Sequence, residues 1–205
     1  MGIKLGMPVA LGESVFTPLT PQDPPRKPWT REEVEACERA GLWEGQHYEL
    51  INGELINKMG KNRPHVFGAR RARWVLEEVF GRERVFSEAP IDVAPEDHPT
   101  SEPEPDIYVL RTPGFRGNES EPDELVLVVE VSDTTLAWDR NTKAALYARA
   151  GIPEYWALDL NGRRLIVHRQ PEGSVYKSVV AYDEQERVAP LAADGREIPV
   201  ADLFA

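Results

Sequence analysis

The run LVLVVEVSD at residues 125–133 constrains the fold more than any other part of this chain. Five apolar residues, Leu125 to Val129, are followed by Glu130, Val131, Ser132 and Asp133. An unbroken Val/Leu run that ends in polar residues is typical of a strand buried on both faces of a sheet. An ionised carboxylate is costly in such a strand unless it has a partner. The run therefore predicts an inner strand and a partner for Glu130.

The remaining patterns place helices and strands around this strand. Thr30 and Glu33 form a predicted capping box that starts a helix, and Gly41 ends it. The dipeptide Asn52-Gly53 between two extended runs predicts a β-hairpin. Further helices are expected at 65–80 and 139–150, and further strands at 84–87, 91–93, 107–110, 154–160, 164–170 and 174–182, with loops at 111–124 and 184–199. This order predicts an α/β or α+β fold, with a central sheet wrapped by helices.

The chain divides into a short arm and one domain. Residues 1–28 contain six prolines, which favours an irregular arm that could pack on a partner subunit over a domain of its own. The remaining residues, 29–205, are of a length that suits a single domain.

Two carboxylates fall where neighbouring strands could bring them together. Asp106 follows Pro105 and precedes the apolar strand IYVL, and Glu130 interrupts the strand at 125–131. A small set of oxygen ligands, completed by water, is what Mg²⁺ prefers in proteins. The two residues are therefore candidate metal ligands. The simpler alternative is that Asp106 caps a turn and Glu130 pairs with an arginine.

Lys143 lies in the middle of the apolar stripe of its expected helix, together with Leu146, Tyr147 and Ala150. A buried ammonium group needs a partner. The helix follows the strand that carries Glu130, so we expect Lys143 to point at Glu130 and Asp106. The alternative is that the lysine stem covers apolar surface while its head reaches solvent.

His65 begins its expected helix on the inward face, where a histidine more often makes one structural hydrogen bond than takes part in catalysis. It becomes a candidate because the hairpin before it carries Glu49 and Glu54. With a two-residue turn, both glutamates share one face of the hairpin. The pattern does not choose between them, and the position of Glu54 beside the turn favours Glu54.

The net charge of −11 argues against a general nucleic-acid coat protein, because phosphate binding requires Lys and Arg. The basic residues are nevertheless concentrated, since residues 55–76 contain no Asp or Glu. Arg70, Arg71 and Arg73 in this stretch are candidate contacts to a DNA backbone. The plain alternative is a solvated basic helix face.

Several protein classes are disfavoured. The sequence shows no Gly-rich phosphate loop, no dinucleotide fingerprint, no nucleophile elbow and no zinc-finger spacing. No apolar stretch approaches the roughly 20 residues of a membrane span, and the N-terminus does not resemble a signal peptide. The single cysteine, Cys37, excludes an internal disulfide, so we expect a cytoplasmic protein.

The order of several segments resembles the Uma2 family (DUF820) of restriction-endonuclease-like proteins. The segments are YELINGEL, His65, PDIYVL, LVLVVEVSD, WDRNTKAALYARAGIPEYWALDL and IPVADLF, and the resemblance covers about residues 29–205. It implies the PD-(D/E)xK nuclease fold, a mixed sheet flanked by helices with a metal site, in which Asp106 and Glu130 are the two motif acids. Most of that superfamily places a lysine two residues after the second acid, where this chain has Ser132. Members of the Uma2 group are similar to one another in carrying the lysine on the following helix, which is Lys143 here.

These features together predict a DNA endonuclease that uses Mg²⁺ or Mn²⁺. Asp106 and Glu130 would hold the ion, Lys143 would act on the attacking water or the phosphate, and Glu54 and His65 would complete the site. The resemblance also implies a homodimer. One alternative is an inactive nuclease fold that binds DNA or a protein, which the net charge and Ser132 favour. A weaker one is a hydrolase of another phosphate ester.

Overall fold

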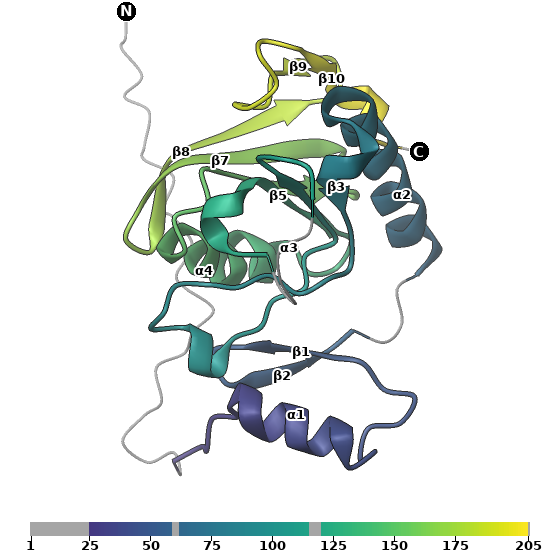
Figure 1. Ribbon diagram of the computed structural model, residues 1–205. Coiled ribbons are helices and arrows are strands. Elements are labelled where there is room, and N and C mark those ends of the chain that lie inside the picture. Colours follow the sequence, from purple (N-terminus) through teal and green to yellow (C-terminus); the bar gives the residue numbers. More distant parts are fainter. Residues whose placement is uncertain (1–24, 59–61, 115–119, 205) are drawn as a thin grey trace, which may run out of the picture.

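A mixed six-stranded sheet forms the centre of the computed structural model, which describes residues 25–58, 62–114 and 120–204 (Figure 1). In spatial order the strands are β3 (Val85–Phe86), β4 (Ile107–Leu110), β5 (Leu125–Ser132), β6 (Glu154–Asp159), β7 (Arg164–Glu172) and β8 (Val175–Asp183). Only β5 and β6 run parallel, and the other neighbours are antiparallel. The expected mixed sheet flanked by helices is confirmed.

Strand β5 is buried along its whole length, as its apolar run predicts. Its alternate side chains enter two separate cores, because successive residues of a strand point to opposite faces. Val129 and Val131 face the core under helix α2 (Arg63–Phe80), which holds Leu76. Val128 faces the other core, which holds Tyr147 of helix α4 (Ala144–Arg149). Glu130 follows Val128 onto this second face.

The crossover from β5 to β6 is more irregular than one helix. It consists of α3 (Leu136–Trp138), a π-helical turn η4 (Asp139–Lys143) and α4. The helical segment thus begins before residue 139, where the sequence predicted its start. Single π turns inside α-helices are rare in proteins, and those that occur are often found at functional sites. Here the first and last residues of the turn, Asp139 and Lys143, are both buried.

Helix α1 (Arg31–Arg39) and the hairpin of β1 (Tyr48–Ile51) and β2 (Glu54–Asn57) form a layer at one end of the sheet (Figure 1). The predicted capping box of Thr30 and Glu33 is present. Asn52 and Gly53 have φ values of 50° and 78°, the left-handed conformations that a tight two-residue hairpin turn requires. Both local predictions are confirmed.

Two predicted segments differ from the structure. Residues 91–93 form no continuous strand, and Ile91 makes an isolated bridge to Ser120. Part of the expected loop at 111–124, residues 115–119, lies outside the described residues. The expected loop at 184–199 contains the short strands β9 (Arg187–Val188) and β10 (Ile198–Pro199), which pair with each other. The remaining short elements are 3₁₀ turns at η1 (Arg82–Arg84), η2 (His98–Thr100), η3 (Pro122–Glu124) and η5 (Val200–Leu203).

The predicted arm lies mostly outside the described residues, which begin at Pro25. Residues 25–28 are exposed and form no helix or strand. Pro28 packs against the turn of the hairpin, where a Cβ added to Gly53 would lie 2.4 Å from the Pro28 Cβ. Among the helices that the structure describes, none combines the length and apolar character needed to cross a membrane.

Candidate active site

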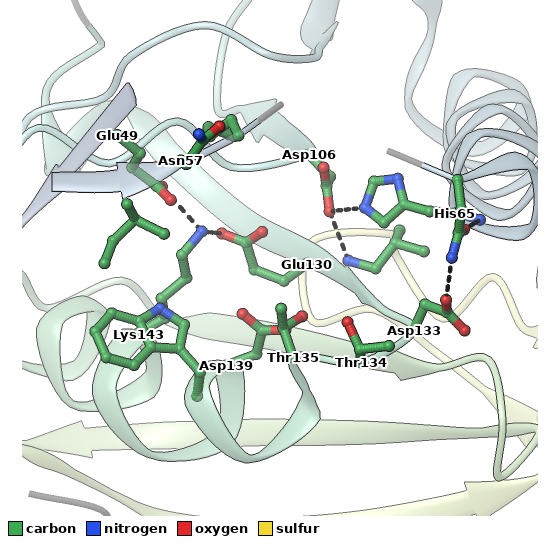
Figure 2. Close-up of a pocket in the computed structure, with 15 residues that line it drawn as sticks. Glu49, Asn57, His65, Asp106, Glu130, Asp133, Thr134, Thr135, Asp139 and Lys143 are labelled. Carbon is green, nitrogen blue, oxygen red and sulfur yellow. Dashed lines mark hydrogen bonds and ion pairs between the residues drawn. The ribbon is translucent and has the colours of Figure 1, made fainter. Parts of the chain in front are cut away.

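A cavity of about 250 Å³ opens where β5 ends, between the sheet, the hairpin, the start of α2 and the turn η4 (Figure 2). Most of its lining side chains are polar or charged. They include Glu49, Asn57, Lys58, Asn62, His65, Asp106, Glu130, Asp133, Thr134, Thr135, Asp139 and Lys143. The cavity therefore gathers charged groups from five separate segments of the chain.

Asp106 and Glu130 meet at this cavity because of the register of β4 and β5. Ile107 pairs with Val129, so Asp106 lies opposite Glu130 one position beyond the last pair. The Asp106 carboxylate accepts a hydrogen bond of 2.8 Å from the Val131 backbone N–H. Asp106 and Glu130 are 5% and 4% exposed, yet both line the cavity. Both predicted acids thus lie at one place, buried but open to a ligand.

Lys143 lies between two carboxylates (Figure 2). Its Nζ is 2.8 Å from Glu130 Oε1 and 2.9 Å from Glu49 Oε1, and the residue is only 4% exposed. Burial alone lowers the pKa of the ammonium group, but Glu130 and Glu49 outweigh burial and hold this pKa well above its usual value. Lys143 is therefore a fixed buried cation, and its head does not extend to solvent.

The Glu130 carboxyl is held by two donors. Besides Lys143, the buried Tyr147 hydroxyl donates a hydrogen bond of 2.7 Å to Glu130 Oε1. Burial raises the pKa of Glu130 to about 8, Lys143 opposes this shift, and Asp106 and Glu49 add to it. Lys143 thus offsets only part of the cost of burying this carboxylate. This arrangement supplies the partner that the apolar strand demands.

The structure places Glu49, and not Glu54, beside Lys143, so the preference for Glu54 is corrected. The two residues do share one face of the hairpin, since Glu49 pairs with Ile56 and Ile51 pairs with Glu54. The hairpin, however, lays its open end over the cavity and its turn against Pro28. Glu54 at the turn is exposed. Glu49 is 3% exposed and also accepts a hydrogen bond of 2.8 Å from the Glu104 backbone N–H.

His65 reaches Asp106 from the first turn of α2. Its Nε2 lies 3.2 Å from Asp106 Oδ2. Asn62 caps this helix end by accepting a hydrogen bond of 3.0 Å from the His65 backbone N–H. The buried Nδ1 of His65 has no hydrogen-bond partner among the described residues. The imidazole can therefore orient Asp106 through one nitrogen, which leaves the other for a water or a ligand.

The sequence analysis missed Asp139, a buried acid that also lines the cavity. Its carboxylate accepts hydrogen bonds from the Ser132 hydroxyl at 2.8 Å and from the Thr135 hydroxyl at 2.6 Å. Burial raises the pKa of Asp139, against the opposing effect of Lys143 and the two hydroxyls. Ser132, two residues after Glu130, thus donates its hydroxyl hydrogen bond to Asp139. The only sequence signal was its place at the start of the expected helix.

The acids fit a hard divalent cation. Asp106 and Glu130 offer carboxylate oxygens at an open cavity, and Mg²⁺ commonly uses one or two carboxylates with waters completing its shell. Within the described ranges, no group of three or more His, Cys, Asp or Glu residues is arranged to hold a metal ion. The residues present therefore suit a cation that keeps several waters, and not a closed site built from protein ligands alone.

The three candidate arginines of α2 separate in the structure. Arg70 and Arg73 line a hollow of about 540 Å³ that shares His65 and Asp106 with the first cavity. Arg71 instead donates a hydrogen bond of 2.8 Å to the Asp202 carbonyl and lines a different hollow. The geometry thus favours Arg70 and Arg73 over Arg71 as neighbours of the site.

Comparisons with known proteins agree with this architecture. The model of the Uma2 family, described as "Putative restriction endonuclease", matches residues 32–201. A crystal structure of a "putative nuclease belonging to DUF820" from Anabaena variabilis is similar to this chain with a TM-score of 0.59 and 21% sequence identity. The match covers 77% of this chain and 89% of the other, and at this identity it supports the fold alone. The comparison with curated proteins found no match.

Proposed function

This chain belongs to the Uma2 family, and from that membership and the buried charges at the cavity we propose that it is a DNA endonuclease that depends on Mg²⁺ or Mn²⁺. One observation carries the proposal. Lys143 lies 2.8 Å from Glu130 and 2.9 Å from Glu49, buried at the edge of an open cavity that Asp106 also lines. Perturbed charges gathered in a cavity are typical of a catalytic site, whereas a structural ion pair needs no opening.

Asp106 and Glu130 would hold the cation. When bound, a divalent ion lowers the pKa of water and offsets negative charge that develops on a phosphate. Asp106 is prepared for this role by the Val131 N–H and by His65, which fix its carboxylate. Glu130 is prepared by the Tyr147 hydroxyl, which donates a hydrogen bond to its carboxyl and so fixes its position.

Lys143 would orient the attacking water or stabilise the negative charge of the transition state. In the hydrolysis, water adds to phosphorus, the ester P–O bond breaks, and the departing oxygen takes a proton. Lys143 can serve this step because Glu49 still holds its ammonium group when Glu130 is committed to a cation. We therefore assign Glu49 as the residue that positions Lys143.

A second candidate is a nuclease fold without activity, which binds DNA or a protein. Ser132 stands two residues after Glu130, where the PD-(D/E)xK resemblance leads one to expect a lysine, and its hydroxyl donates a hydrogen bond of 2.8 Å to the Asp139 carboxylate. The net charge of −11 also disfavours tight binding to DNA. The two candidates differ in one respect, namely metal-dependent turnover.

Cleavage of a supercoiled plasmid distinguishes them. We expect nicking with Mg²⁺ or Mn²⁺, none with a chelator, and loss of nicking in Glu130→Ala. The matched control is Glu172→Ala, because Glu172 is exposed on β7 and far along the sheet from the cavity. Plasmid binding without cleavage by the folded wild-type protein, with either ion and at every pH tested, would instead support the inactive module.

A further inference from the structure

The outer face of α2 exposes large apolar side chains beside the site. Val66 and Phe67 are each 50% exposed, and Trp74 is 44% exposed. Helices usually turn such residues toward the core, so a group of them on the solvent side indicates a binding surface. Their neighbours on the same face include Arg63, Arg70 and Arg73, and residues 62–76 contain no acidic residue.

Arg70 and Trp74 form a stacked pair on this face. The guanidinium carbon of Arg70 lies 4.4 Å from the centroid of the Trp74 ring. Arg70 makes no ion pair with a carboxylate in the part of the chain that the structure describes. Arg73, in contrast, donates hydrogen bonds to Glu77 at 2.8 Å and to Ser87 at 2.9 Å. The charge of Arg70 is therefore available to an anionic ligand.

The hollow beside this pair adjoins the cavity that holds the acids. The hollow that Arg70, Arg73 and Trp74 line reaches His65 and Asp106, which also line the cavity with Glu130. A chain-like ligand could thus have one phosphate at the acids and another part of its length on Trp74.

We propose that this face binds unpaired nucleotides of the substrate strand, with a base stacked on Trp74 and a phosphate at Arg70. The substrate class would then be single-stranded or locally unpaired DNA, an inference that rests on the proposed nuclease function. Aromatic rings bind bases by stacking without sequence preference, and an arginine on the ring adds a cation–π contribution. In a duplex the base faces are already stacked on each other, so Trp74 has nothing to bind.

A second copy of this chain is a poorer occupant. Two such faces packed together would bring the arginines of both copies into contact, and like charges repel. A nucleic acid strand instead offers phosphates to the arginines and bases to the aromatic ring. The hollow also holds Glu77 and Glu88, so the contact with a phosphate is assigned to Arg70 on the exposed face of α2, where the arginines favour the strand over a second copy.

Binding to labelled oligonucleotides tests the proposal, with a chelator present so that no hydrolysis occurs. We expect a single strand to bind more tightly than a duplex of the same sequence. Trp74→Ala should weaken the single strand about tenfold, the scale of one lost base stack, and should change the duplex little. Trp74→Phe should keep most of the affinity. Val179→Ala, which removes an exposed apolar side chain from β8, should behave as wild type.

The substrate can be varied as well as the protein. An oligonucleotide with abasic sites should bind the wild-type protein as weakly as an intact strand binds Trp74→Ala. Equal affinity of wild type and Trp74→Ala for the intact single strand would overturn the proposal, whatever the plasmid assay shows. The proposal would also be overturned if Trp74→Ala turned a dimer into a monomer while its affinity for the strand stayed unchanged. If metal-dependent cleavage is absent but strand binding depends on Trp74, the nuclease is refuted and the binding face is supported.

Discussion

Replacing Lys143 by methionine removes the buried cation while keeping the apolar length of the side chain. In the folded protein, Glu130 and Glu49 lie 2.8 Å and 2.9 Å from Lys143 Nζ. Removing one partner of a buried ion pair typically costs about 3–5 kcal/mol, because the other charge stays buried and unpaired. Here Glu130 can offset part of this cost by taking up a proton, since its pKa is already raised to about 8.

The loss of stability in Lys143→Met should therefore depend on pH. Near neutral pH, where Glu130 is protonated in the variant, we expect a loss of about 1–3 kcal/mol in the free energy of unfolding. The loss should grow as the pH rises above 8. There Glu130 ionises beside Lys143 in wild type, whereas in the variant it has to stay protonated, which costs about 1.4 kcal/mol per pH unit. Mg²⁺ should reduce the loss, since it replaces the missing positive charge near Glu130.

Urea unfolding with and without Mg²⁺ measures these changes, and the plasmid assay measures the effect on cleavage. Cleavage should fall by about 10²-fold or more, the scale of one preorganised electrostatic group. The control is Lys177→Met, because Lys177 lies on β8 with its side chain 52% exposed and pairs with the exposed Glu172. A Lys143→Met protein with wild-type stability and wild-type cleavage would refute both the ion-pair argument and the catalytic assignment.

Three further predictions concern stability. Burial lowers the pKa of His168 to about 4, so the unfolded chain binds a proton more readily below about pH 6.5. His168 should therefore contribute a loss of up to about 3 kcal/mol in stability between pH 6.5 and 4, and in matched urea titrations His168→Gln should lose less stability than wild type over this range. Gly68→Leu should cost about 1–3 kcal/mol in thermal unfolding, because a Cβ added at Gly68 would already lie 2.8 Å from Leu160 Cδ2. A variant as stable as wild type would show that Leu160 or α2 can move to make room. Deleting residues 1–24 should leave a cooperative unfolding transition, since the described core is assembled from later residues. Loss of that transition in the truncated protein would show that the arm is part of the domain.

Local chemistry by itself determined much of this fold. The Val/Leu run at 125–129 specified a strand buried on both faces, because no exposed strand tolerates such a sequence. Asn52-Gly53 specified the hairpin turn, since few other residue pairs adopt two successive left-handed conformations. These signals act over a few residues, so they are readable without knowledge of what packs where.

The order of motifs also indicated the family, and with it two acids and a lysine. The apolar stripe of the expected helix pointed Lys143 inward independently of that resemblance, and the structure has Lys143 buried beside Glu130. The catalytic roles of Asp106, Glu130, Lys143 and His65 remain predictions that the experiments above address.

Only the tertiary structure decided which groups share the cavity. Glu49 and Glu54 occupy the same face of one hairpin, and the choice between them depends on which end of the hairpin covers the sheet. That docking is fixed by long-range contacts, such as the 2.7 Å hydrogen bond from the Glu102 N–H to the Leu50 carbonyl. The buried position of Asp139 depends likewise on a π turn and on Ser132 of a neighbouring strand. Local sequence patterns carry no information about such contacts, because each partner is chosen by the packing of segments that are distant along the chain.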